Sequence, residues 1–418
     1  MTLEPVHIKE ISRIVSNIDV SNEDDKESEM TSDLLGYLQE LKYRGRVILK
    51  SMEKLYRGKV NIEQMSRSSD PFEITYACDS GSTNPITFDS GLFVDFCHCA
   101  LASTPTDLDL HMKRTIVAAA YNPSENVTIK TTDGWQEFDE GSGRKNIIRI
   151  QPGILNKRIG RMVHDIALYL AESEHMNWML DGLDDNGILI MDGPIYPKRL
   201  MYWMVVESED IQVQYDPHTK TILQNYIDIM DEHVKQQKPL IGFVKNPEDI
   251  QIIQALKQNG VWGIPWAMDA QFFKNLLSLK GHDDDENKYI TYTNWFIQPN
   301  KFYEKMLNTT SPLVEDTLEH EYPADDYSLT FFMVYVPWMD VIFKIESPYG
   351  ITKNEELRDN IKRKVLYDIS INGIPRTLSK ADSIAKIRKS EREQIKEQFN
   401  TLKIDTSYND VRWSETDV

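Results

Sequence analysis

The sequence predicts an α/β fold in which a central sheet is flanked by helices. Residues Ile188–Met191 form a short apolar run that ends at Asp192, as in a strand buried on both faces. Apolar and polar side chains alternate over residues 72–79, which indicates a second strand. Between these strands, residues 155–179 carry apolar side chains at helical spacing, which predicts a long amphipathic helix.

Two helices are expected before the first strand. Residues 1–22 predict a short amphipathic helix, and an apolar stripe predicts a longer helix from about Leu34 to Tyr56. The longer helix either packs on its own domain or forms a surface for a partner or a second copy. We therefore expect an N-terminal helical region in residues 1–65, a main domain in residues 66–400 and a loose polar tail in residues 401–418.

The remaining elements alternate between strands and helices, as in a sheet covered on both faces. Further strands are expected at residues 86–89, 91–101, 115–121, 127–131, 239–244, 289–296, 329–336 and 341–346. Further helices are expected at residues 218–237, 247–259, 269–279, 353–370 and 379–399.

The composition restricts the classes of function. The 418 residues include 66 acidic and 47 basic side chains, giving a net charge of −19. This balance does not favour extended nucleic-acid binding, but a local basic surface with metal ions can still hold phosphate. The cysteines, Cys78, Cys97 and Cys99, form no CxxC pair, and His98 points to the opposite side of its strand from its two neighbours. We expect structural cysteines and a reducing compartment.

We expect no segment that directs the chain to a membrane. No apolar run approaches the roughly 18–20 residues that span a bilayer, and the first residues have neither a basic nor an apolar leader region. We therefore expect a cytoplasmic protein.

Two carboxylates are candidates for a metal site. Asp79 and Asp192 each follow a predicted strand and precede a glycine-containing turn. Aspartate at a strand end is often only a turn former. Two such aspartates in one α/β sheet, however, predict carboxylates that converge at one edge, which is how Mg²⁺ or Mn²⁺ is held for phosphoryl chemistry. Glu174 continues the buried stripe of the helix before Asp192 and Glu172 lies beside it; either reaches the same edge, or both belong to an ordinary helix end.

Basic residues offer contacts to phosphate. Lys245 follows the strand at residues 239–244, where it either contacts a scissile phosphate or is simply exposed. Lys386, Arg388 and Lys389 either follow a nucleic-acid backbone or form a solvated helix face. The basic loop at residues 141–145 lacks the P-loop pattern, and the chain has no nucleotide-hydrolysing motif.

A series of short motifs resembles the NurA nuclease family, the partner of the HerA-type ATPase in DNA end processing. The motifs keep the family's order over roughly residues 70–390. They are Asp79-Ser-Gly-Ser82, Ile188-Leu-Ile-Met-Asp-Gly-Pro-Ile195, Ile241-Gly-Phe-Val-Lys245, Phe343-Lys-Ile-Glu-Ser-Pro348 and Asn372-Gly-Ile-Pro-Arg376 followed by Lys380-Ala-Asp382. The resemblance implies an RNase H-like core, a mixed sheet with helices on both faces.

The resemblance also implies roles for particular residues. Asp79 and Asp192 would be metal ligands, and Glu174 or Glu172 would be a third. Where the family often has a histidine after its Gly-x-Pro segment, this chain offers Asp382. Two metal ions held by such carboxylates supply the nucleophilic water and stabilise the leaving oxygen in phosphodiester hydrolysis.

The activity implied by the resemblance is that of a deoxyribonuclease dependent on Mn²⁺ or Mg²⁺, with Mn²⁺ favoured. Such an enzyme degrades DNA from 5′ ends and cuts single strands during double-strand break processing. The implied partners are single-stranded DNA and duplex ends, a hexameric HerA-type ATPase and a second copy of the chain. The rival hypotheses are an inactive RNase H-like scaffold that docks DNA or the ATPase, which the Asp382 departure favours, and an RNA-cutting relative.

Overall fold

The computed structural model of the chain describes residues 4–18, 30–31, 33–124, 127–151, 159–197, 216–279, 286–299, 318–399 and 402–405. Its centre is a mixed sheet. β4 (Ile74–Ser82), β6 (Phe93–Thr104) and β7 (Arg114–Tyr121) are antiparallel neighbours in chain order. On the other side of β4, β10 (Gly187–Asp192) and β11 (Leu240–Val244) follow in parallel. These five strands lie in the order third, second, first, fourth and fifth along the chain, which confirms the predicted RNase H-like core.

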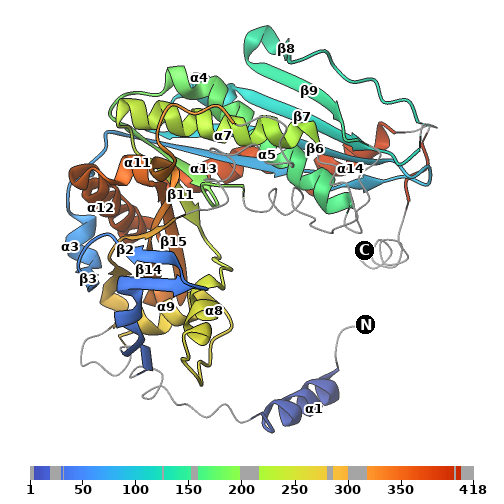
Figure 1. Cartoon of the computed structure of the whole chain (residues 1–418). Helices are drawn as coiled ribbons and strands as arrows, with labels where there is room; N and C mark the ends of the chain where they lie inside the picture. The colour runs from blue at the N-terminus through green and yellow to red at the C-terminus, as the bar shows by residue number, and fades with distance from the viewer. Residues whose placement is uncertain are drawn as a thin grey trace.

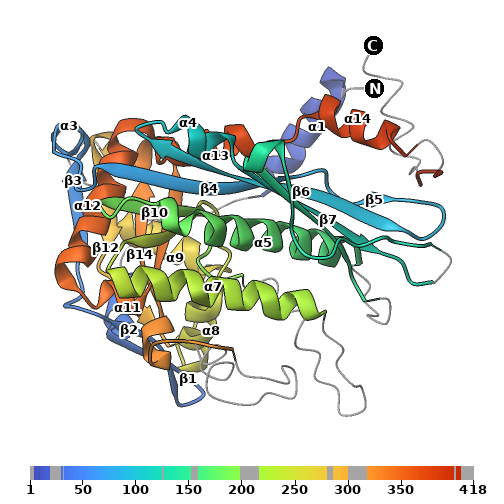
Figure 2. The ribbon, with the colours of Figure 1, turned by 90° about the horizontal axis from the view of Figure 1, so that it is seen from above.

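Helices cover both faces of this core. α5 (Ile159–Met179) packs against β4, β6 and β7, and α7 (Pro217–Gln236) packs beside α5 on the same face. The opposite face of β4 and β6 carries α13 (Arg376–Ala385), as Figure 2 shows. The site described below lies where these two layers meet the ends of the central strands.

The sheet continues beyond the core in both directions (Figure 1). β15 (Val341–Pro348) pairs antiparallel with β11, and β9 (Gly143–Arg149) pairs parallel with β7. The remaining strands are β1 (Glu40–Tyr43), β2 (Arg46–Ser51), β3 (Arg57–Asn61), β5 (Ile86–Thr87), β8 (Gln136–Phe138), β12 (Tyr289–Thr293), β13 (Phe296–Gln298) and β14 (Leu329–Val336). The remaining α-helices are α1 (Pro5–Val15), α3 (Ile62–Ser66), α4 (Leu108–Met112), α8 (Gln251–Gln258), α9 (Asp269–Leu277), α11 (Tyr349–Thr352), α12 (Glu355–Asn372) and α14 (Lys389–Glu397).

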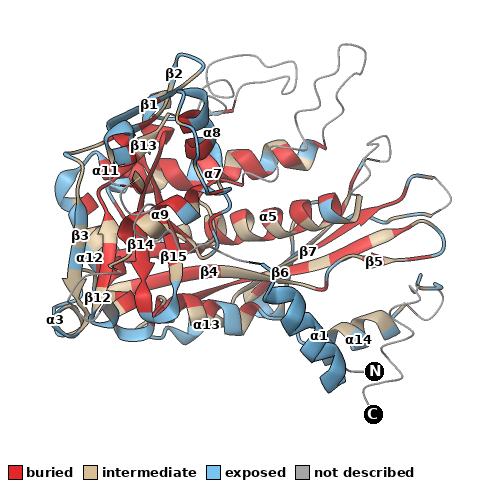
Figure 3. Cartoon of the chain, turned by 90° about the horizontal axis from the view of Figure 1, so that it is seen from below, coloured by how far each residue is buried: buried red, intermediate tan, exposed pale blue. Residues whose placement is uncertain are grey.

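The apolar interior is divided between the two ends of the sheet. The larger cluster lies between the central strands and helices α5 and α7, and a second cluster joins α8 and α9 to the N-terminal strands. Figure 3 shows the buried residues along the central strands and α5, whereas α1 is exposed all round. Within the described part of the chain, no helix combines the length and apolar character needed to cross a bilayer.

The helix expected from Leu34 to Tyr56 is wrong. After a short 3-10 turn, this segment forms the hairpin β1–β2, in which Tyr43 pairs with Arg46. Arg44 and Gly45 both have positive φ, 50° and 74°, as in the type I′ turns that join hairpin strands. β2 then pairs with β13, so this segment belongs to the main sheet. The proposed division at residue 65 stays a prediction, although its helical description does not hold.

Three other expectations need correction. Residues 127–131 form no strand, and the last three residues of the basic loop expected at residues 141–145 belong to β9. The closing helix at residues 379–399 is two helices, α13 and α14, separated at residues 386–388. The polar tail expected at residues 401–418 lies mostly outside the described residues.

Candidate active site

Three parallel strands deliver polar side chains to one edge of the central sheet. In the pairing of β10 with β4, Met191 lies opposite Cys78, so Asp192 and Asp79 leave the ladder side by side. β10 pairs on its other side with β11, where Asp192 lies opposite Phe243. Lys245 follows β11 directly, and its Nζ lies 2.6 Å from Asp192 Oδ2. The structure thus brings together three of the predicted site residues.

The turn after Asp192 is held against β11. Gly193 has φ 115°, which favours glycine, and its N–H donates to the carbonyl of Phe243 at 3.1 Å. A Cβ on Gly242 would lie 2.6 Å from the nitrogen of Ile195, so glycine is needed where the turn crosses β11. The Ile195 N–H in turn donates to Glu346 Oε2 at 3.2 Å. These contacts fix the direction in which Asp192 points.

Glu346, which accepts the hydrogen bond from this turn, belongs to a buried ionic group. Lys344 Nζ lies 2.8 Å from Glu346 and 2.5 Å from Asp249, and Lys344 is almost fully buried. Burial opposes the charge of this lysine, but Glu346 and Asp249 raise its pKa above the usual value. The motif around Lys344 and Glu346 therefore stabilises the turn after Asp192. In the sequence, only the family resemblance pointed to this motif.

β4 continues past Asp79 to Ser82, three residues beyond the predicted strand end. The extension pairs with β6 and lies under α13. A Cβ on Gly81 would lie 1.8 Å from the carbonyl oxygen of Ala385, so the glycine of the Asp-Ser-Gly-Ser motif lets α13 approach the strand. Asp382, exposed on α13, comes close enough for its charge to raise the pKa values of Asp79 and Asp192.

Glu172 joins this group from α5. Its Oε1 accepts a hydrogen bond from Ser80 Oγ at 2.5 Å, and the hydroxyl of Tyr226 on α7 also hydrogen bonds to it. Ser80 itself donates its backbone N–H to Asp79 Oδ1 at 2.7 Å. One residue of β4 therefore connects the carboxylates of Asp79 and Glu172.

The structure does not place Glu174 with this group, so of the two glutamates left open in the sequence only Glu172 lies beside Asp79. The carboxylate of Glu174 accepts from Asn225 Nδ2 at 3.0 Å and lies 3.5 Å from the guanidinium of Arg144. That guanidinium is held between the rings of Trp135 and Trp178. Residues two apart on a helix are rotated by about 200° from each other, so Glu172 and Glu174 face different neighbours.

The charges of the group are poorly balanced without a cation. Burial and then the charge of Asp192 raise the pKa of Asp79 to about 7. Burial, followed by Asp79 and Asp192, raises the pKa of Glu172 to about 8, despite the hydrogen bond from Ser80. Burial also raises the pKa of Asp192, which Lys245 opposes. A set of oxygen donors that repel each other fits a hard divalent cation.

A cavity of about 500 Å³ opens beside these carboxylates. Glu172 and Asp192 form part of its wall, together with apolar side chains from α5 and from the turns after β10 and β11. Those side chains include Leu168, Met176 and Pro194. The volume is within the range of small-molecule sites, and the lining combines apolar side chains with carboxylates.

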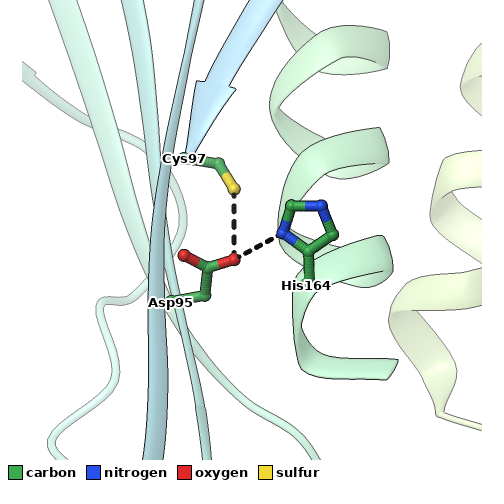
Figure 4. Close-up of side chains that lie close together, drawn as sticks. All are labelled: Asp95, Cys97 and His164. Atoms are coloured by element: carbon green, nitrogen blue, oxygen red, sulfur yellow. Dashed lines mark hydrogen bonds and ion pairs between the residues drawn. The ribbon is translucent and has the colours of Figure 1, made fainter. Parts of the chain in front are cut away.

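A second cluster was missed in the sequence. Asp95 and Cys97, two apart on β6, share one face of the strand and meet His164 of α5 (Figure 4). Among the described residues, these three have donor atoms within 4.8 Å of one another. No three of the predicted carboxylates meet that spacing within the described part of the chain. The i, i+2 spacing of Asp95 and Cys97 was visible in the sequence, but the distant histidine was not.

Hydrogen bonds explain the close approach of Asp95, Cys97 and His164 without a metal ion. Ser82 Oγ lies 2.8 Å from both carboxylate oxygens of Asp95 and 3.2 Å from His164 Nδ1, so the hydroxyl occupies the space between the donor atoms. Burial, and next the charge of Asp95, raise the pKa of the Cys97 thiol well above its usual value. A protonated thiol and a central hydroxyl do not form a metal site.

Residues 73–387 match the family model described as the NurA domain, which is three quarters of the chain. The chain belongs to the NurA family. This is a nuclease family, and the matched range of the NurA domain contains every carboxylate described above as well as Lys245. Strands β1–β3 and helix α14 lie outside the match.

Solved NurA structures are similar to the chain over most of their length. The NurA nuclease from Sulfolobus solfataricus has 12% identity and a TM-score of 0.47, and the similarity covers 96% of this chain and 97% of that chain. A NurA structure bound to dAMP and manganese has 12% identity and a TM-score of 0.47, and the similarity covers 96% of this chain and 98% of that chain. A NurA structure with manganese has 12% identity and a TM-score of 0.41, and the similarity covers 90% of this chain and 97% of that chain. A comparison with curated proteins found no match.

Proposed function

We propose that the chain is a metal-dependent DNA nuclease whose catalytic centre is the group formed by Asp79, Glu172, Asp192 and Asp382. The observation that carries this proposal is the convergence of Asp79 and Asp192 at the ends of adjacent parallel strands, with Glu172 joined to Asp79 through Ser80. Membership in the NurA family supplies the reaction class, hydrolysis of a phosphodiester.

Asp79, Glu172 and Asp192 would hold the metal, and Asp382 would complete the set from the opposite face of the sheet. Mn²⁺ or Mg²⁺ is the proposed ion, because carboxylate oxygens are the donors these ions prefer. When bound, the ion supplies Lewis-acid polarisation of the phosphoryl group and activation of water. Asp382 replaces the histidine expected from the resemblance, and as a carboxylate it offers a ligand rather than a neutral-pH acid or base.

The chain's own residues position the reactants. Lys245 is partly exposed and lies at the same strand edge as Asp192, where its ammonium can contact the phosphate that is cleaved. Ser80 holds the carboxylates of Asp79 and Glu172 in place through its N–H and its hydroxyl. Lys386, Arg388 and Lys389 are exposed where α13 gives way to α14, and we propose that they contact the DNA backbone.

The finer activity is also a proposal. We propose 5′→3′ exonuclease activity and endonuclease activity on single strands, in double-strand break end processing with a hexameric HerA-type ATPase. The absence of a nucleotide-hydrolysing motif in the sequence supports a separate motor protein. We propose further that the chain forms a homodimer, and that its N-terminal region provides a surface for one of these partners.

The test is cleavage of a 5′-labelled single-stranded oligonucleotide with Mn²⁺, with Mg²⁺ and with EDTA. Cleavage by the wild type that requires metal and is lost in Asp79→Ala would support the proposal. If the wild type does not cut, the assay is repeated with the ATPase and ATP. No cleavage there either would favour a scaffold that docks DNA without cutting it. Parallel RNA and duplex DNA substrates test the substrate class.

A further inference from the structure

His164 lies on the same face of α5 as two residues that line the cavity beside the carboxylates. His164, Leu168 and Glu172 are spaced by four residues, so they follow one face of the helix, and the latter two line the cavity. On β4, Ser80 contacts Glu172 and Ser82 contacts His164. His164 is therefore a second polar position along the same helix–strand junction, about 12 Å along the helix axis from Glu172.

The ring of His164 is held by a buried carboxylate. Asp95 has no exposed surface, and its oxygens accept hydrogen bonds from Ser82 Oγ at 2.8 Å and Thr83 Oγ1 at 2.9 Å. His164 Nδ1 lies 2.8 Å from Asp95 Oδ2, as Figure 4 shows. The hydroxyls and the Cys97 thiol are neutral donors, and His164 is the ion-pair partner of Asp95 in the described part of the chain. A buried carboxylate needs such hydrogen-bond partners, since an unpaired buried charge is strongly unfavourable.

This arrangement leaves one nitrogen of the ring for a ligand. Nδ1 faces Asp95, so Nε2 points away from the buried carboxylate. The side chain is 24% exposed, and the hydrogen bonds found for it among the described residues all involve Nδ1. An Nε2–H group that donates to a phosphate oxygen forms a charge-assisted hydrogen bond, because the phosphate is ionised.

We propose that His164 binds a backbone phosphate of the nucleic-acid strand next to the position that is cleaved. This inference rests on the proposed nuclease function and adds a phosphate subsite to it. Ser80 and Ser82 lie about 7 Å apart along β4, which is about the rise of two strand residues. His164 is thus far enough from the carboxylates to contact a neighbouring phosphate rather than the one that reacts.

The first experiment measures binding of the full-length protein to a 5′-fluorescent single-stranded oligonucleotide in EDTA, where no cleavage occurs. His164→Ala is expected to weaken binding by about tenfold, the effect of losing one charge-assisted contact. His164→Arg, which keeps N–H donors for a phosphate oxygen, is expected to bind within about twofold of the wild type.

His218 provides the matched control. Its Nδ1 lies 2.5 Å from Asp216, and the two side chains are 27% and 1% exposed, nearly the values for His164 and Asp95. It begins α7 rather than lining up with the cavity residues of α5. His218→Ala is expected to leave binding unchanged. An equal loss in both variants would overturn the proposal, because it would show only a general effect of positive charge.

A second experiment separates contact from folding. Removing His164 alone leaves Asp95 without its partner, so the double variant Asp95→Asn/His164→Gln is used, in which the buried pair is neutral. Oligonucleotides with one methylphosphonate each remove one phosphate charge at a time. The wild type is expected to bind one of them more weakly, at a position near the cleaved bond, and the double variant is expected to lose that sensitivity.

The outcomes distinguish this inference from the function on which it rests. A wild type that cleaves DNA, with a double variant that keeps the same pattern of methylphosphonate sensitivity, overturns the phosphate subsite alone. A wild type that neither binds nor cleaves DNA, with or without the ATPase, overturns the proposed function and the subsite together.

Discussion

Asp192 pairs with Lys245, and its charge raises the pKa values of both Asp79 and Glu172. We predict that Asp192→Ala reduces cleavage by at least about 100-fold, as expected when a group that organises charge is lost. Lys245 is partly exposed, so water can solvate it and the fold should remain. Cleavage rates, thermal melting and gel filtration measure this.

Asp185 is the control for that variant, since its side chain is 91% exposed and its ion pair is with Lys238. Asp185→Ala should cleave like the wild type. Full activity in Asp192→Ala would contradict the assignment of the site.

Glu172 and Glu174 provide a second test at the scale of single residues. Glu172→Gln is expected to abolish the thermal shift caused by Mn²⁺ and most of the cleavage. Glu174→Gln is expected instead to lower the free energy of unfolding by about 1–3 kcal/mol, because Arg144 loses its carboxylate partner, while the Mn²⁺ response remains. The same loss of Mn²⁺ response in both variants would contradict the different placements of the two carboxylates.

The raised pKa values of the site predict a pH dependence. Asp79 and Glu172, with pKa values of about 7 and about 8, keep protons in the folded, metal-free protein that the unfolded chain loses near pH 4. Their contribution to stability is therefore complete below pH 4 and is lost as the pH rises through 7 and 8.

A bound cation replaces those protons, so Mn²⁺ should bind more tightly as the pH rises, by roughly tenfold per unit for each proton displaced. Melting temperatures between pH 6 and 9, with and without Mn²⁺, measure both effects. A Mn²⁺-induced shift that does not change with pH would contradict this prediction, and Glu172→Gln should flatten the profile.

The proximity of Asp79 and Asp192 could be predicted from the sequence, because parallel strands end at the same edge of a sheet. The choice between Glu172 and Glu174 could not, since it depends on which face of α5 rests on β4. The pair of Asp95 with His164 was also beyond the sequence, because β6 and α5 meet only in the folded chain.

At the scale of elements, Gly81 determines how closely α13 approaches β4. Gly81→Ala would place a methyl group 1.8 Å from the carbonyl oxygen of Ala385, so the helix must move away. Because Asp382 is carried by α13, we expect cleavage to fall by roughly 100-fold, as for a displacement of about 1 Å at a catalytic site. Cleavage rates and the Mn²⁺ titration measure the effect.

Gly182→Ala is the matched control, since a Cβ there would meet nothing within 4 Å. It should leave cleavage unchanged. A Gly81→Ala variant with normal activity would show that α13 is not needed close to the strand.

The expected helix at residues 34–56 shows why elements are harder to predict than motifs. Leu35, Leu38 and Leu41 have helical spacing, but the next buried leucine, Leu49, lies beyond a hairpin turn. The Arg44–Gly45 pair was the local signal for that turn. Burial in the second core, between α8, α9 and the main sheet, overrides the helical pattern.

At the scale of the whole molecule, the N-terminal segment has two parts with different roles. α1 has no buried residue, and Ile8, Ile11 and Ile14 are exposed on it. β2 and β3, in contrast, pair with β13 and β12 of the main sheet. We predict that deletion of residues 1–18 leaves melting temperature and oligonucleotide cleavage intact and weakens binding to the ATPase.

Deletion of residues 1–61 is expected instead to destabilise the fold, because it removes sheet pairings and part of the second core. Melting curves, cleavage of short single strands and pull-down with the ATPase compare the two deletions. Equal loss of cleavage and ATPase binding on removing residues 1–18 would indicate that α1 is part of the main domain that cleaves DNA.

The separation of Asp79 and Asp382 along the sequence has a consequence for synthesis. Asp79 is synthesised long before Asp382, which is carried by α13 to its place against β4. A nascent chain, or one cut short by a premature stop between these two residues, therefore carries the first carboxylate without the last. The order of the sequence thus delays assembly of the proposed set of carboxylates until α13 has been synthesised.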